Sequence, residues 1–132
     1  MRRALEEAAR VVQPARPIVV VEPLAEGSFF SALRPVEDET DVRTAAQETL
    51  RLALQGGVFE QLRRVDYNRR EHFEGLDQFL SRVVAVDPAR TAVAAERRPE
   101  VEAAFRRHAQ VAADGRRTLE QPMRAYVLRA SG

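Results

Sequence analysis

The chain has 132 residues, of which 45% are hydrophobic and 31% are charged, so it can bury a core. It contains no cysteine, which excludes disulfides, thiolate catalysis and cysteine-ligated metal. All 21 basic residues are arginine, and 20 acidic residues leave a formal net charge of +1. This balance gives no indication of nucleic-acid binding, and the lack of lysine excludes a Schiff-base or P-loop lysine.

The apolar runs are much shorter than the roughly 20 residues that span a bilayer, so no membrane segment is expected. Glu6 and Glu7 lie where a signal peptide would have its apolar core. We therefore expect a cytoplasmic protein that folds as a single domain over residues 1–132.

Residues 3–12 are expected to form a helix, because apolar residues recur there at helical spacing and Pro14 and Pro17 end the pattern. A strand is expected next, over Ile18–Val21. This run is continuously apolar and β-branched, which is typical of a central parallel strand covered on both faces.

Residues 27–33 are expected to hold a short helical turn, with Phe29 and Phe30 directed inward. A longer helix is predicted over residues 38–55, because apolar positions again recur at helical spacing. Gly56-Gly57 provides the left-handed stop that is common just after a helix.

The second half of the chain is expected to alternate helices with two further strands. Residues 58–69 alternate imperfectly between apolar and polar, as in a strand near a sheet edge. Three helices are then predicted, over residues 77–86, from Pro88 onward and over 100–112, and a closing strand covers residues 117–130. The fold class is therefore α/β, with about three strands.

Residues 5–23 resemble a stretch of the class I S-adenosylmethionine-dependent methyltransferases. In that family a helix beginning with Leu and ending in Arg-Val-Leu-x-Pro-Gly-Gly precedes the hydrophobic fifth strand. Here Leu5, the run Arg10-Val11-Val12-Gln13-Pro14 and the strand ending in Glu22-Pro23 have the same register. Ala15-Arg16 replace the two glycines, and a non-glycine residue in such a turn costs about 1 kcal/mol or more.

The resemblance implies that the chain is the C-terminal portion of a Rossmann-like methyltransferase sheet. The family places its last, antiparallel strand between the fifth and the sixth. The strands over residues 17–24, 62–69 and 117–129 would then lie in the order first, third, second. Residues of about 75–113 would be a helical insertion between the last two strands.

The same resemblance implies that the cofactor-binding half is absent. The family's glycine-rich loop and ribose-binding acid would precede residue 5, and the six glycines of this chain include no G-x-G pair. S-adenosylmethionine is the family's cofactor, but we expect this chain alone neither to bind it nor to be active. Full-length relatives would methylate a small molecule, and methyltransferase activity here would require the missing half.

Five residues are candidates for substrate binding, and no catalytic residue is assigned. Glu22 ends a strand at the edge where ligands bind in open α/β sheets. Phe29, Phe30 and Arg34 are expected on a loop over the pocket, as a lid or an anion clamp, and His72 follows the second strand. Each candidate also has an interpretation without a role in binding. Glu22 would face solvent at the strand end, the two phenylalanines would belong to the core, and His72 would be a surface residue. No histidine pair and carboxylate have metal-ligand spacing, so no metal is expected.

A sheet that begins at Ile18–Val21 would have an unpaired hydrophobic edge, which is a template for association. We therefore expect this strand to be buried against a partner chain, most simply a second copy in a homo-oligomer such as a dimer. This expectation gives an alternative function, a non-catalytic α/β interaction module that self-associates through the strand. Neither nucleic acid nor a membrane is expected as a partner.

Overall fold

The computed structural model of the protein describes residues 2–11 and 16–131. Within these residues the chain forms six helices and four strands. Their bounds are α1 (Arg2–Val11), β1 (Pro17–Pro23), α2 (Ser28–Leu33), α3 (Thr40–Gln55), β2 (Phe59–Phe73), α4 (Leu76–Val86), α5 (Arg90–Glu96), α6 (Arg98–His108), β3 (Gln110–Val111) and β4 (Arg117–Ala130).

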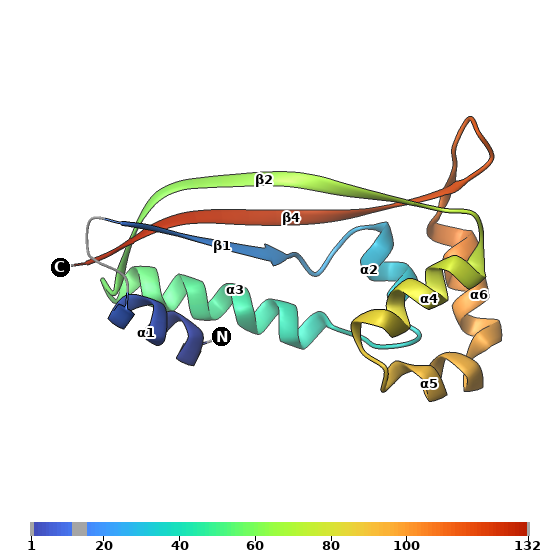
Figure 1. Ribbon diagram of the computed structural model, residues 1–132, viewed down its shortest axis with the longest axis horizontal. Coiled ribbons are helices and arrows are strands. Elements are labelled where there is room, and N and C mark those ends of the chain that lie inside the picture. The colour runs from blue at the N-terminus through green and yellow to red at the C-terminus, as the bar shows by residue number, and fades with distance from the viewer. Residues whose placement is uncertain (1, 12–15, 132) are drawn as a thin grey trace. The chain divides into compact units, whose positions relative to one another are not determined.

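The four strands form one open sheet in the order β1-β4-β2 (Figure 1). The short strand β3 also pairs with β4. β1 and β3 are each antiparallel to β4, and Val20 of β1 lies opposite Tyr126. Side-chain pairs between β2 and β4 advance in opposite directions along the two strands, which shows that they are antiparallel as well. The fold is therefore α/β, with an antiparallel sheet and accompanying helices.

The chain divides into two compact units, and β2 and β4 run through both. The first unit comprises residues 1–24, 40–67 and 123–132, and the second comprises residues 25–39 and 68–122. The helices predicted as an insertion over about 75–113 are present as α4, α5 and α6, and all belong to the second unit.

In the first unit, α1 and α3 lie along one face of β1 and β4 (Figure 1). Ile18 and Val20 of β1 pack on the core of this unit, whereas Val19 and Val21 are 61% and 44% exposed. The buried core residues are Leu5, Leu50, Phe59, Tyr126, Leu128 and Ala130.

The expectation that Ile18–Val21 forms a central parallel strand, covered on both faces, was wrong. β1 is an edge strand antiparallel to β4, not a central parallel strand, and only one of its faces is covered. Alternate residues of a strand point to opposite faces, but here both sets are aliphatic. The sequence alone therefore does not show which residues of β1 are buried and which are exposed.

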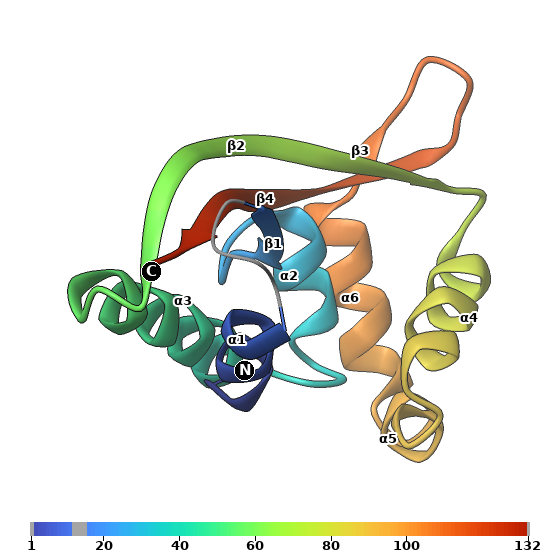
Figure 2. The same cartoon turned by 60° about the vertical axis from the view of Figure 1, so that its left-hand side comes forward.

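The second unit has a separate core built around phenylalanine rings. Phe79 stacks on Phe105 with ring centroids 5.1 Å apart, and Phe29 and Phe73 approach Phe79 edge-on at 5.7 and 5.5 Å. α2 packs against α6 beside this cluster (Figure 2). Edge-on and offset ring contacts stabilise beyond the burial of apolar area alone.

Most predicted elements are confirmed, with small differences in their bounds. α1, α3 and β4 nearly match the predicted ranges, and Gly57 ends α3 with a φ of 75°. Val12, the predicted last residue of the first helix, lies outside the described residues. β2 continues to Phe73 rather than ending at Arg69, and β3 was not predicted. No helix in the described part of the chain is both long and apolar enough to cross a membrane.

Candidate functional site

A groove of about 640 Å³ lies in the first unit between α1, β1 and α3. Among the described residues that line it, Glu22 and Thr49 are the polar ones, and the Thr49 hydroxyl already donates to the Ala45 carbonyl at 2.9 Å. The apolar lining residues are Ala4, Leu5, Ala8, Ile18, Val20, Val42, Ala45 and Ala46. An apolar concavity with one available polar group is a common form of small-molecule site.

Glu22 lies near the carboxyl end of β1, as the sequence predicted, and its side chain lines this groove. Among the described residues the Glu22 carboxylate makes no hydrogen bond and no ion pair. Partial burial raises the pKa of the Glu22 carboxyl above its usual value, because the charged form loses hydration. Glu22 is therefore an incompletely solvated acid with no hydrogen-bond or ion-pair partner in the described part of the chain.

The cation opposite Glu22 is bound to a different acid. Glu22 pairs in register with Arg124 of β4, so the two side chains lie on the same face of the sheet. Arg124 instead donates to both carboxylate oxygens of Asp66 on β2, at 2.9 and 3.2 Å. This pairing holds the pKa of Asp66 below its usual range. Asp66 thus competes for the arginine that could otherwise neutralise Glu22.

Two polar contacts fix α3 on this face of the sheet. The Tyr126 hydroxyl of β4 donates to Gln47 Oε1 at 2.5 Å, and Arg43 Nη1 donates to the carbonyl oxygen of Leu24 at 2.9 Å. Gln47 and Arg43 are one helical turn apart on α3, so they lie on the same side of the helix. These contacts hold the α3 wall of the groove in place.

Phe29 and Phe30 are core residues rather than an exposed lid. The expected loop is the helix α2, and each phenylalanine is only 6% exposed. The Phe29 ring contacts Phe79, and the Arg82 guanidinium lies 6.0 Å from its centroid. The alternative interpretation, that the adjacent phenylalanines belong to the core, is confirmed for both side chains.

Arg34 and His72 each have a local partner. Arg34, which follows the last residue of α2, donates to Asp38 at 3.2 Å. His72 lies within β2 rather than after a strand, and its Nδ1 is 2.8 Å from the Thr118 hydroxyl. Glu22 belongs to the first unit, whereas the other four candidates belong to the second.

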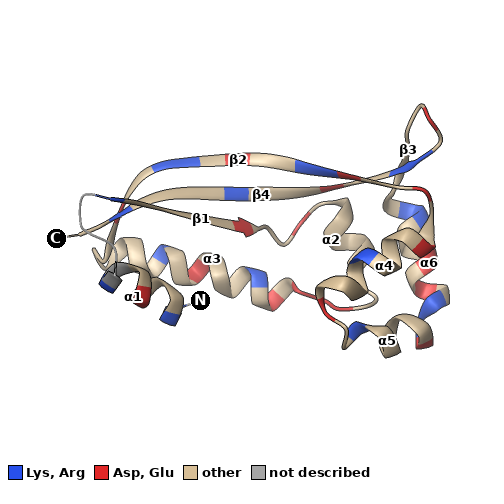
Figure 3. Cartoon of the chain, viewed as in Figure 1, with Lys and Arg blue, Asp and Glu red and all other residues tan. Residues whose placement is uncertain are grey.

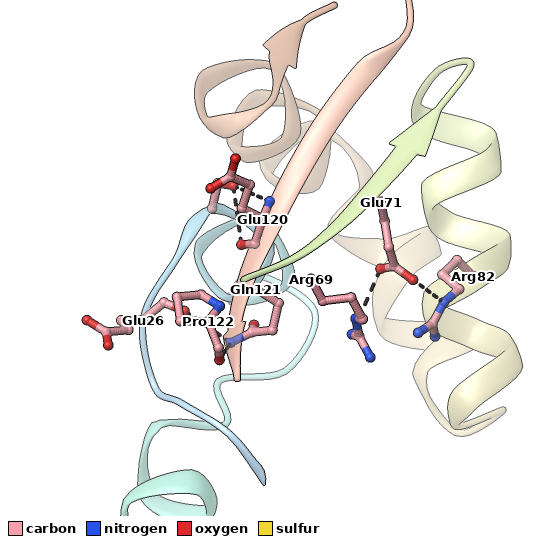
Figure 4. Close-up of polar contacts among 8 residues, drawn as sticks. Glu26, Arg69, Glu71, Arg82, Glu120, Gln121 and Pro122 are labelled. Carbon is pink, nitrogen blue, oxygen red and sulfur yellow. Dashed lines mark hydrogen bonds and ion pairs between the residues drawn. The ribbon is translucent and has the colours of Figure 1, made fainter. Parts of the chain in front are cut away.

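Polar side chains of the second unit mainly neutralise or tether one another (Figure 4). Glu71 lies 3.1 Å from Arg82 and 4.0 Å from Arg69. The buried Gln121 amide donates to the carbonyl oxygens of Glu26 and Pro122, at 3.3 and 2.9 Å. Acidic and basic residues also alternate along the helices and strands (Figure 3). These contacts are structural.

Across the described ranges 2–11 and 16–131, no three His, Cys, Asp or Glu side chains are grouped so that they could hold a metal ion. Comparison of the chain with models of known protein families and with curated proteins found no match. The functional conclusion therefore depends on the residues and the geometry of the chain itself.

Sequence reasoning identified Glu22 but not the groove around it. The lining positions of α1 and α3 belong to the apolar stripes that the helical periodicity predicts, and such stripes usually face a filled core. The available signal was residue size, because Ala4, Ala8, Ala45 and Ala46 all have small side chains. The pairing of Arg124 with Asp66 had no local signal, since 58 residues separate them.

Proposed function

We propose that the chain is the C-terminal half of a class I S-adenosylmethionine-dependent methyltransferase-like fold, with a Rossmann-like sheet that the family's cofactor-binding half would complete. The resemblance of residues 5–23 supports this, as does the antiparallel β4 between β1 and β2. The observation that carries the proposal is the position of β1 at the sheet edge, where the missing strands would add. On this proposal the chain alone is inactive, and the completed cytoplasmic protein methylates a small molecule.

Calorimetric titration of the purified chain with S-adenosylmethionine tests the missing-half proposal. We expect no binding at micromolar cofactor concentration. The described residues include no glycine-rich loop at a strand end, which would let the protein backbone approach the cofactor closely. A methyltransferase with an intact glycine-rich loop, titrated under the same conditions, provides the positive control. A micromolar dissociation constant for this chain would overturn the proposal that its cofactor-binding half is missing.

The exposed edge also favours a second candidate function, a non-catalytic module that self-associates through β1. Val19 and Val21 expose apolar surface, and the outer backbone groups of β1 have no neighbouring strand among the described residues. Strand addition would satisfy these backbone groups. A second copy is the simplest partner, because two identical edges can pair antiparallel about a two-fold axis.

Sedimentation velocity separates this second candidate from the first. We expect a dimer at micromolar concentration, and Val19→Lys should shift it to monomer by placing a charge beside the shared edge. Val86→Lys is a matched control, because Val86 at the end of α4 is also 61% exposed. A monomeric wild-type chain whose Ile18–Val21 amides exchange rapidly would rule out self-association, whatever the outcome of the cofactor titration.

A further inference from the structure

We propose that the groove between α1, β1 and α3 is a binding site for a small amphiphilic amine, with its hydrocarbon portion in the groove and its ammonium group on Glu22. This proposal does not depend on the methyltransferase-like function. It uses the helix-covered face of β1, whereas the proposed association uses the free edge of that strand.

The lining of the groove favours a hydrocarbon body for the ligand. Eight of the ten described residues that line it are aliphatic, and the Thr49 hydroxyl donates to its own helix. Transfer of a hydrocarbon from water into such a lining contributes about 25 cal/mol per Å² of apolar surface removed from water. A volume of about 640 Å³ is within the usual range for small-molecule sites.

The charge in the groove favours a cationic head group. The Glu22 carboxylate is partly buried and has no protein partner among the described residues. Burial of an unpaired carboxylate is unfavourable, and a charge-assisted hydrogen bond from an ammonium group would offset that cost. A ligand carboxylate would instead be repelled, and a neutral ligand would leave the charge unpaired.

The positive charge of the amino terminus lowers the pKa of the Glu22 carboxyl less than burial raises it, and the neighbouring arginines do not pair with Glu22. Arg124, opposite Glu22 in the sheet, is held by two hydrogen bonds to Asp66, and Arg43 of α3 donates to the Leu24 carbonyl. Asp66 therefore acts as a positioning residue for the site, because it draws Arg124 away from Glu22. Loss of the Asp66 charge would release Arg124 to pair with Glu22 and compete with the ligand.

The test uses n-octylamine as the probe and 1-octanol as its uncharged counterpart, with binding followed by amide chemical shifts in NMR titrations. We expect octylamine to bind the wild-type chain and to shift amides of α1, β1 and α3, with octanol about tenfold weaker or more. Glu22→Gln should weaken octylamine binding to the level of octanol. Glu48→Gln, on the exposed face of α3, should leave both affinities unchanged.

Two further variants keep the result interpretable. Ala46→Leu should weaken both probes by filling the groove, and Asp66→Asn should weaken octylamine while leaving octanol unchanged. Amide spectra of each variant without probe show whether its fold is retained. The proposal is overturned if octylamine does not bind the wild-type chain, if octanol binds equally well, or if the folded Glu22→Gln variant binds octylamine as tightly as wild type.

Discussion

At the scale of single residues, Gly27 shows the strongest local requirement for its residue type. Its φ is 99°, and an added Cβ would lie 2.3 Å from Pro122 Cδ and 2.9 Å from the Glu120 carbonyl oxygen. The neighbouring Ser28 hydroxyl accepts a hydrogen bond from the Glu120 amide at 2.7 Å. The chain before α2 thus runs against β4, at a distance that only glycine allows.

Gly27→Ala should lower the free energy of unfolding by about 3 kcal/mol, because it combines an unfavourable φ with overpacking against β4. Gly57→Ala is the matched control. Gly57 also has a positive φ, of 75°, but its missing Cβ would meet no atom within 4 Å, so the cost should be about 1 kcal/mol. Urea unfolding measures both values. Equal losses would show that the close approach to Pro122 contributes nothing.

The candidate site was only partly predictable from single residues. Glu22 could be proposed because an acid at the end of an apolar strand has a recognisable local pattern. Its lack of a partner could not, because it depends on Arg124 pairing with Asp66 across two strands far apart in sequence. The burial of Phe29 and Phe30 likewise depends on rings contributed by α4 and α6. Tertiary contacts therefore decide the role of each candidate.

At the scale of elements, Arg90 connects α5 to the segment between α2 and α3. Its Nε donates to Glu37 at 2.5 Å, its Nη2 lies 3.5 Å from Glu39, and its Nη1 donates to the Val83 carbonyl at 3.3 Å. Arg90 is only 8% exposed. A buried guanidinium with several acceptors is costly to remove, because those acceptors then lose their partner.

Arg90→Met should destabilise the protein by about 2 kcal/mol, less than for a fully buried pair because Glu37 retains partial contact with water. Arg98→Met is the comparison, since the Arg98–Asp77 pair is exposed to solvent and its loss should destabilise the protein much less. Chemical denaturation of the two variants gives the difference. Similar losses would contradict the role assigned to Arg90.

Helices were easier to predict than strand environments, because their periodicity, prolines and glycines are local. The order of the helices followed from such signals, and the bounds of β4 were also predicted correctly. Which residues of β4 are buried could not be predicted in the same way. Its buried residues include Leu119 and Gln121, but later Tyr126 and Leu128, so the alternation slips by one residue after Met123. A single period-2 pattern cannot describe such a strand, since Leu119 packs with residues of α2, α4 and α6, whereas Tyr126 and Leu128 pack with residues of α1 and α3.

At the scale of the whole molecule, the chain has two cores with no residue in common. Leu50 belongs to the core of the first unit, and Phe79 to that of the second. Both side chains are almost completely buried. β2 and β4 nevertheless pass through both units. The sequence predicts a single domain. Because the two cores are separate, whether the two units unfold together is a question for experiment.

Leu50→Ala and Phe79→Ala should each cost about 3 kcal/mol through lost burial and the cavity left behind. If each core stabilises its own unit, Leu50→Ala should reduce amide protection in α3 and β1 while leaving α4 and α6 protected. Phe79→Ala should produce the reverse pattern. Hydrogen exchange resolved by peptide distinguishes these outcomes, with unsubstituted protein as the reference. Equal loss of protection in both units from either substitution would show one cooperative domain despite the two cores.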